Sequence, residues 1–368
     1  MRDVRQQRRL WPVAAAGLLA LLLAACASRA PQAVDTGPST APPDPPAGSA
    51  APVAIELEPP SAQAGGTVVG RNERLVVYRP APGDTFEGVS ARFLGRADRA
   101  WTIAEANGLA RPDADVPLVV PLKPLNTFGV QPDRVQLVPI LCYHRLGTGN
   151  SKMVVSPASF EAQMAWLVRN DYRVVRLADL GAFLAGEQPL PPRAVIITFD
   201  DGYESVHRHA FPVLKKYGLP ATAFVYTDFL GGGDALTWPQ LQDLQASGLV
   251  DVQSHSKSHR NLIERRPGET DDRYRANIDS EMRVPREVLE RRLAPLKVRH
   301  LAYPFGDAND IVLDSAARHG IELAATVAPG GNPFYAQPLL LRRTMIFGDM
   351  NLEVFKSKLV VSRPLTSP

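Results

Sequence analysis

Hydrophobic positions between residues 137 and 355 follow two alternating patterns. Short apolar runs typical of buried strands recur seven times, and each is followed, after a loop, by a segment with apolar residues at helical spacing. Repeated strand–helix units indicate an α/β domain with a parallel sheet that is either open or closed as a barrel, and seven strands favour a distorted (β/α)7 barrel. The predicted strands are 138–143, 173–175, 194–199, 221–225, 250–253, 300–303 and 323–327, and the predicted helices are 156–170, 177–184, 203–217, 238–247, 272–293, 311–319 and 352–359.

A smaller pattern precedes this domain. Residues 74–122 read as strand, helix, helix and strand, and Asn107-Gly108 ends the second helix as a C-cap. Residues 26–73 are rich in Pro, Ala, Ser and Gly and lack the apolar side chains that a core needs, so we expect a tether there. We therefore predict a small βααβ domain at 74–122, a linker at 123–136 and the α/β domain at 137–360.

The first 25 residues have the pattern of a secretory signal. An Arg-rich start is followed by an apolar run from Leu10 to Ala25, shorter than the ~20 residues of a spanning helix. Leu23-Ala24-Ala25-Cys26 resembles a bacterial lipoprotein processing site, which implies cleavage before Cys26 and its lipidation. By the same resemblance, Ala27-Ser28 implies an anchor in the outer membrane, facing the periplasm; an ordinary cleaved signal is the alternative.

Composition narrows the class of protein. The 368 residues are 45% hydrophobic and 21% charged, which excludes a disordered or fibrous chain. Of the 41 Lys and Arg against 38 Asp and Glu, residues 1–25 hold four Arg against one Asp, so the remainder balances at 37 against 37. This balance does not suggest a nucleic-acid partner, and no protein partner is predicted. Two cysteines exclude a disulfide framework, and Cys142 reads as a small buried hydrophobe.

Polar residues gather where three predicted strands end, which is where chemistry gathers in parallel barrels. Asp200-Asp201-Gly202 follows strand 194–199, and two adjacent carboxylates repel each other unless something, such as a metal ion, neutralises one of them. His255 and His259 follow strand 250–253, four residues apart, which would place both imidazoles on one face of a helical turn at zinc-ligand spacing. An Asp N-cap beside a solvated Asp is the structural alternative for the first pair.

The third strand end, Tyr303-Pro304-Phe305-Gly306, offers an apolar wall and a backbone N–H. By contrast, the charged helix 272–293, which includes Glu281 and Glu287, reads as a solvated face.

These strand ends together resemble the polysaccharide deacetylase family with the NodB homology domain. Thr198-Phe199-Asp200-Asp201-Gly202 matches its first motif and His255-Ser256-Lys257-Ser258-His259 its second. Tyr303-Pro304-Phe305-Gly306 and Val138-Pro139-Ile140-Leu141-Cys142-Tyr143-His144 resemble the branch that acts on poly-N-acetylglucosamine. The resemblance implies hydrolytic N-deacetylation of N-acetylglucosamine units in an envelope polysaccharide.

The resemblance also implies roles for single residues. Asp200 would be the general base, and Asp201, His255 and His259 would hold a divalent metal, for which zinc is the first choice and iron, cobalt and nickel are alternatives. The oxyanion would rest on the N–H of Phe305. Substrate would contact Tyr143, Tyr303 and Pro304.

Two expected family residues are missing. The Arg that orients the base in many members is Ala302 here, and Arg343 is the candidate replacement. No His follows His319, so the general acid is either His144 or Asp200 itself once it has accepted a proton.

Residues 74–122 resemble a LysM domain through Gly83-Asp84-Thr85 and Asn107-Gly108-Leu109, which implies affinity for N-acetylglucosamine glycans. A LysM-shaped spacer without such affinity is the alternative. The polymer stays open between peptidoglycan and a poly-N-acetylglucosamine exopolysaccharide. A glycan-binding lipoprotein without activity is the competing function, and a glycoside hydrolase fits adjacent Asp residues and a His pair poorly.

Overall fold

The computed structural model describes residues 64–149 and 151–365. The predicted signal at 1–25, Cys26 and most of the predicted tether lie outside this range. None of the helices in the described part of the chain has the length and apolar character needed to cross a membrane.

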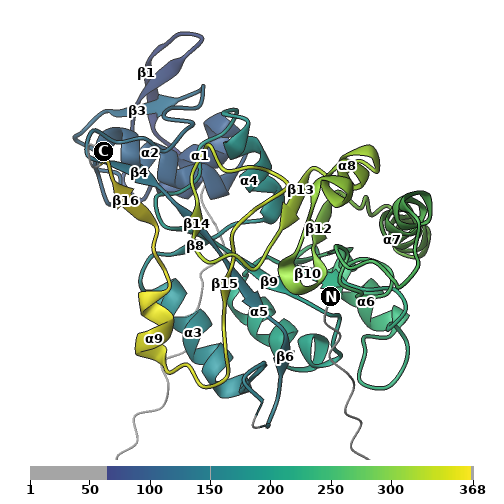
Figure 1. Ribbon diagram of the computed structural model, residues 1–368. Coiled ribbons are helices and arrows are strands. Elements are labelled where there is room, and N and C mark those ends of the chain that lie inside the picture. Colours follow the sequence, from purple (N-terminus) through teal and green to yellow (C-terminus); the bar gives the residue numbers. More distant parts are fainter. Residues whose placement is uncertain (1–63, 150, 366–368) are drawn as a thin grey trace, which may run out of the picture. The chain divides into compact units, whose positions relative to one another are not determined.

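The α/β domain is built on a curled, mainly parallel sheet in the order β13-β12-β11-β10-β9-β5 (Figure 1). Each neighbouring pair along this path is parallel. Its strands are β5 (Val138–Tyr143), β9 (Ala194–Phe199), β10 (Ala221–Val225), β11 (Val250–Ser254), β12 (His300–Ala302) and β13 (Leu323–Ala325).

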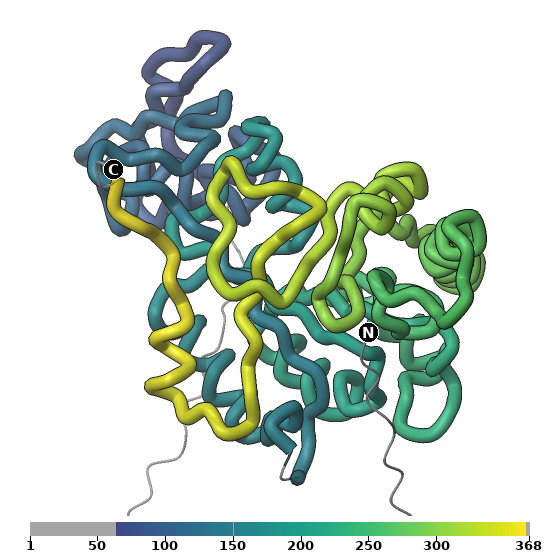
Figure 2. Tube along the Cα trace, in the orientation of Figure 1, coloured from purple at the N-terminus to yellow at the C-terminus, as the bar shows by residue number. Residues whose placement is uncertain are grey.

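The seventh position of the ring is filled by a strand that the sequence pattern did not indicate. Strand β15 (Thr344–Met345) pairs in parallel with β5, and Leu341 just before it bridges in parallel to Ala325 of β13. Figure 2 traces this yellow C-terminal segment back alongside the earlier strands. The predicted strand 173–175 instead becomes β8 (Arg173–Val174), which pairs only with the start of β9 and stays off the main path.

Side-chain alternation along the strands divides the core in two. Val138 and Ile140 of β5 and Ile196 of β9 belong to one apolar cluster with Phe183 of α4 (Leu177–Leu184) and Leu341. The alternate positions pack in a second cluster with the surrounding helices. These helices are α3 (Pro157–Arg169), α5 (Phe211–Tyr217, preceded by a π-helical turn at Val206–Ala210), α6 (Trp238–Ala246), α7 (Asp271–Arg292), α8 (Asp310–Arg318) and α9 (Leu352–Ser357).

The smaller unit has its own core and a three-stranded antiparallel sheet. Its elements are β1 (Thr67–Arg71), β2 (Leu75–Arg79), α1 (Phe86–Leu94), the 3₁₀ turn Ala97–Arg99, α2 (Ala100–Asn107) and β3 (Leu118–Pro121). The βααβ order is as expected, but β1 falls inside the predicted tether, so the folded part begins before residue 74.

The expected linker at 123–136 also carries structure. Its last residues form β4 (Arg134–Gln136), which pairs antiparallel with β16 (Ser362–Pro364), beyond the predicted domain end at residue 360. Three further two-residue strands complete the described chain: β6 (Arg145–Leu146), β7 (Val154–Val155) and β14 (Gly331–Asn332).

Candidate active site

The two adjacent carboxylates leave the end of β9 in different directions. Asp200 continues the strand's alternation on the side of Ile196 and Thr198, and its side chain is buried. Asp201 takes a left-handed backbone conformation, with φ of 73°, and Gly202 follows with φ of 82°. A Cβ at Gly202 would meet Val225 at about 3.1 Å, so this sharp turn suits glycine.

Asp200 forms a buried, bidentate ion pair with Arg343. Arg343 Nη1 donates to Oδ1 and Nη2 to Oδ2, both at 2.7 Å, and the two side chains are 0% and 2% exposed. Arg343 Nε donates to the Thr326 carbonyl at 2.8 Å, and the Cys142 thiol donates to Asp200 Oδ2 at 3.4 Å. Burial alone would raise the pKa of Asp200, but the charge of Arg343 and its hydrogen bonds outweigh burial and lower that pKa to about 2. Asp200 is therefore ionised at neutral pH.

Asp201 faces the two histidines. His255 Nε2 lies 3.4 Å and His259 Nε2 3.2 Å from the same atom, Asp201 Oδ1. His255 Nδ1 lies 2.7 Å from the Ala302 carbonyl, and a proton on Nδ1 is the assignment that makes this a hydrogen bond and leaves Nε2 with a free lone pair. Although Asp201 is largely buried, the neighbouring imidazoles hold its pKa well below the ordinary range.

The histidine pair converges through a loop and not through the expected helical turn. Strand β11 ends at Ser254, and the following loop has left-handed residues at Ser256, with φ of 69°, and at His259, with φ of 58°. The Ser256 hydroxyl accepts a hydrogen bond from the His259 N–H at 3.1 Å. The two predicted imidazoles are therefore adjacent, with ring centroids 4.8 Å apart, because of the conformation of this loop and not because of helical spacing.

The three side chains fit a divalent metal. One ligand atom from each of Asp201, His255 and His259 lies within 4.8 Å of the others. Asp201 Oδ1 is buried and has no hydrogen-bond partner among the described residues, as expected for an atom that faces a cation. Two imidazole nitrogens and one carboxylate form a common catalytic zinc set. Cys142, His144 and Asp200 also lie close together, but Arg343 already occupies both oxygens of Asp200.

The other predicted site residues divide into accessible and buried ones. His144 follows β5 beside Asp200, and burial lowers the pKa of its imidazole below the ordinary value. Phe305, in the 3₁₀ turn Pro304–Gly306, has φ of 61°, is 59% exposed, and has its ring centroid 5.1 Å from that of His259.

The three predicted substrate contacts are buried. The Tyr143 hydroxyl donates to Gln163 Oε1 at 2.7 Å, and its ring packs edge-on against Phe160 in the helix-side core. The Tyr303 hydroxyl donates to the Leu339 carbonyl at 3.0 Å, and Pro304 is also buried. Their side chains offer no surface to a polysaccharide, so the predicted substrate role is wrong for their side chains. Strand alternation is the reason for Tyr143, because it sends Tyr143 to the face opposite Cys142.

Aromatic residues that we did not single out lie next to His259. The Tyr226 ring lies 5.0 Å from His259 and stacks on Phe229 at 5.0 Å, and Phe229 meets Tyr203 edge-on at 5.6 Å. These rings and Phe305 define an aromatic surface, in which Tyr226 and Phe305 each contact His259. Tyr203 directly follows Asp200-Asp201-Gly202, and Tyr226 directly follows β10. Their position at strand ends was the signal in the sequence that could have identified them.

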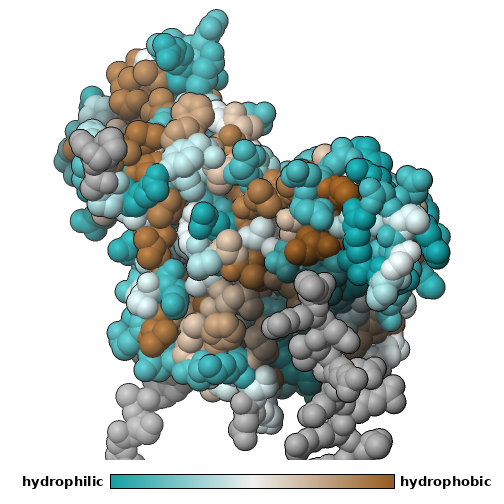
Figure 3. Space-filling view, viewed as in Figure 1, coloured by the Kyte–Doolittle hydropathy of each residue, from teal (hydrophilic) through white to brown (hydrophobic). Residues whose placement is uncertain are grey.

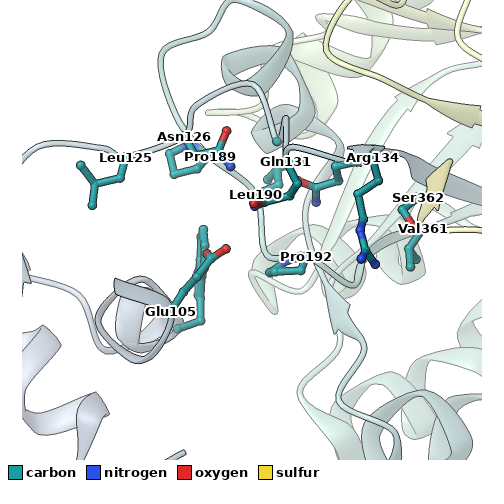
Figure 4. Close-up of a pocket in the computed structure, with 13 residues that line it drawn as sticks. Glu105, Leu125, Asn126, Gln131, Arg134, Pro189, Leu190, Pro192, Val361 and Ser362 are labelled. Atoms are coloured by element: carbon teal, nitrogen blue, oxygen red, sulfur yellow. The ribbon is translucent and has the colours of Figure 1, made fainter. Parts of the chain in front are cut away.

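A separate pocket contains none of these residues. Figure 4 shows it between Glu105 of α2, Leu125 and Asn126 of the 123–136 segment, and Leu190. Burial raises the pKa of Glu105, and Arg134 also lines the pocket, but no predicted motif lies there.

Comparisons with known proteins find sequence matches to this part of the chain. The polysaccharide deacetylase family model matches residues 187–324. A putative polysaccharide deacetylase, YxkH of Bacillus subtilis, is 30% identical over 201 residues, which cover 55% of this chain and 68% of the relative. The poly-beta-1,6-N-acetyl-D-glucosamine N-deacetylase of Staphylococcus aureus is 25% identical over 251 residues, 64% of this chain and 86% of the relative.

Solved structures show the same fold. The Streptococcus pyogenes deacetylase PplD, in complex with acetate, superposes with a TM-score of 0.55 at 26% identity and covers 61% of this chain and 99% of its own. IcaB from Ammonifex degensii superposes with a TM-score of 0.54 at 27% identity, over 61% of this chain and 96% of its own.

Proposed function

Because this chain belongs to the polysaccharide deacetylase family, whose members hydrolyse N-acetyl amide bonds, we propose that its substrate is a poly-N-acetylglucosamine-type envelope polysaccharide. The observation that carries the proposed hydrolysis is that the two adjacent carboxylates have different partners. Asp200 pairs with Arg343, and Asp201 faces the two histidines. The Staphylococcus aureus relative, named for the poly-beta-1,6-linked polymer, supports this substrate over peptidoglycan.

Asp201, His255 and His259 would hold the metal, and we propose Zn²⁺. When bound, such an ion supplies Lewis-acid polarisation of the amide carbonyl and a lowered pKa for water. The hydrogen bond between His255 Nδ1 and the Ala302 carbonyl orients the imidazole and leaves Nε2 to face the metal.

Asp200 is the proposed general base. Its carboxylate is ionised at neutral pH and is held rigidly by Arg343, so it can accept the proton of an attacking water without first rotating. Its low pKa makes it a weak base, so the proton is passed on readily to the leaving amine.

His144 is the proposed alternative proton donor. Burial keeps its imidazole uncharged at neutral pH, so it can act as an acid only after taking up a proton within the same turnover. The backbone N–H of Phe305 is the proposed oxyanion donor, and one donor of this kind contributes about 3–4 kcal/mol to the transition state. The strained backbone of Phe305 at positive φ supports a functional role for this residue.

The aromatic surface of Tyr203, Tyr226, Phe229 and Phe305 supports a sugar substrate. Pyranose rings present apolar C–H faces, and flat aromatic rings beside the reacting centre can pack against them. This surface replaces Tyr143, Tyr303 and Pro304 as the proposed substrate contact.

We further propose that Cys26 carries a lipid anchor in the outer membrane, that the protein faces the periplasm, and that residues 64–122 form a LysM-like glycan-binding unit. The Leu-Ala-Ala-Cys sequence supports the anchor, and the βααβ order with Gly83-Asp84-Thr85 supports the second assignment.

Acetate release from poly-β-1,6-N-acetylglucosamine oligomers and from purified peptidoglycan tests the proposal. The full-length protein is loaded with Zn²⁺, and Asp200→Asn is the control variant. We expect release from the oligomers that the variant abolishes. Equal release from the variant would refute Asp200 as the base, and release from peptidoglycan alone would refute the proposed polymer.

A further inference from the structure

Helix α7 carries a buried carboxylate at Glu281, contrary to the solvated face that its charge pattern indicated. Glu281 is 6% exposed and belongs to the buried residues of the helix, together with Ile278, Met282 and Pro285. Charged residues are rarely buried without a specific partner, so this position calls for an explanation.

The partners of Glu281 are all in the loop between the two histidines. Glu281 Oε2 accepts hydrogen bonds from the Lys257 and Ser258 N–H groups, both at 2.9 Å, and Oε1 accepts one from the Ser258 hydroxyl at 2.6 Å. Within the described ranges, no Lys or Arg forms an ion pair with Glu281. The carboxylate is therefore satisfied by neutral donors from two consecutive loop residues.

This loop has a backbone conformation that needs such support. Ser256 and His259 are non-glycine residues with positive φ, a conformation that side chains with a Cβ adopt only when their surroundings hold them in it. Lys257 and Ser258, which donate to Glu281, lie between them. On its other side the loop is held by Asp228, whose N–H donates to the Lys257 carbonyl at 2.9 Å.

We propose that Glu281 is a positioning residue that fixes the His255–His259 loop and thereby sets the affinity of the site for its metal. The inference rests on the proposed metal centre of the deacetylase. Glu281 binds the backbone of the residues between the two ligands and not the ligands themselves. It lies on helix α7, 22 residues beyond His259 in the chain. The physical basis is that charge-assisted hydrogen bonds to backbone N–H groups are stronger than neutral ones, so the loop is locked by one side chain.

The experiment compares Glu281→Gln and Glu281→Ala with Glu287→Gln. Glu287 lies on the same helix, is exposed and, among the described residues, pairs only with Arg283, so it is a matched control for the loss of one charge on α7. Two properties of the full-length protein are measured. Zn²⁺ affinity is obtained by competition with a chromophoric chelator, and amide hydrogen exchange is followed in peptides that cover residues 254–262.

We expect Zn²⁺ binding to weaken about tenfold in Glu281→Gln and between tenfold and a hundredfold in Glu281→Ala, as for other residues that orient metal ligands. The amides of residues 257 and 258 should exchange faster in both variants, and Glu287→Gln should match the unaltered protein. If Glu281→Ala does not fold, Glu281→Gln decides, because the amide oxygen still accepts from both N–H groups.

Loop exchange and Zn²⁺ affinity in a folded Glu281→Gln or Glu281→Ala variant that equal those of Glu287→Gln would overturn the inference. Failure of the unaltered protein to bind Zn²⁺ would instead refute the proposed metal centre, and the exchange measurement would still decide whether Glu281 fixes the loop.

Discussion

The ion pair between Asp200 and Arg343 makes a prediction whose size follows from its burial. Arg343→Met keeps the length and apolar packing of the side chain over Phe224, whose ring centroid lies 5.9 Å from the guanidinium, but removes the charge. Asp200 would then be a buried carboxylate whose remaining side-chain donor is the weak thiol of Cys142. Breaking a buried pair from one side typically costs about 3–5 kcal/mol of folding stability.

The same change alters the titration of the base. With Arg343 present, the pKa of Asp200 is about 2, below its ordinary value near 3.8. A lowered pKa of this kind contributes stability above the unfolded pKa and loses it as pH falls through about 2. Without Arg343 the strongest opposition to burial is lost, so the pKa of Asp200 should rise and in Arg343→Met the acid limb of activity should move to higher pH.

Two measurements check this reasoning. Urea unfolding at pH 7 should show Arg343→Met to be less stable by about 3–5 kcal/mol. Acetate release per mole of folded, Zn²⁺-loaded protein should fall at pH 7, by less than the loss in Asp200→Asn, because a general base usually contributes about 10²–10⁴-fold and Arg343→Met misplaces the base without removing it. Arg343→Lys should be more stable than Arg343→Met but less stable than the unaltered protein, because a single ammonium restores the charge but not the bidentate hydrogen bonds of the guanidinium. A folded Arg343→Met protein with the original pH profile and activity would refute the role assigned to the pair.

Three other outcomes follow from the structure. Asp201→Asn should weaken Zn²⁺ binding at least tenfold in a chelator competition while leaving the fold unchanged by circular dichroism, because its Oδ1 faces both imidazoles. Tyr226→Ala should raise KM for poly-β-1,6-N-acetylglucosamine pentamer more than it lowers kcat; an unchanged KM would argue against the aromatic surface. Asp84→Ala should destabilise the small unit by about 2 kcal/mol in urea unfolding, because Asp84 accepts hydrogen bonds from the buried Tyr78 hydroxyl at 2.5 Å and from the N–H groups of Gly65, Gly66 and Ala81. Although burial opposes it, those bonds lower the pKa of Asp84, so in the unaltered protein this contribution should be lost as pH falls below about 4.

Local patterns were sufficient for the interior strands. The bounds of β5, β9 and β10 were predicted to the residue, because each is an uninterrupted buried run with clear turn signals at its ends. Strand β15 has only two residues and follows Arg342-Arg343, so nothing in its hydropathy marks it as the element that completes the ring.

The candidate site shows the same division between local and distant information. The metal-ligand candidates Asp201, His255 and His259 are adjacent to strand ends, and the sequence was enough to select them. Glu281 was wrongly predicted to be solvated because many residues of helix α7 are acidic or basic; the surface over α7 is mainly hydrophilic on the face that Figure 3 shows. The available signal was its register with Tyr274 and Ile278 on the apolar stripe.

Strand parity explains how one dipeptide can serve two purposes. In β9, even-numbered side chains point to the side of Ile196, so Asp200 meets Arg343, which β15 brings from 143 residues away. The left-handed turn at Asp201 then sends the next carboxylate toward His255 and His259. Each carboxylate has its own source of positive charge or of ligand nitrogen, so both stay ionised although they are neighbours in the chain. A substitution that moved the turn one residue later would keep Asp201 in strand conformation, on the side of Ile197 and Phe199, and so turn it away from both Arg343 and the two histidines.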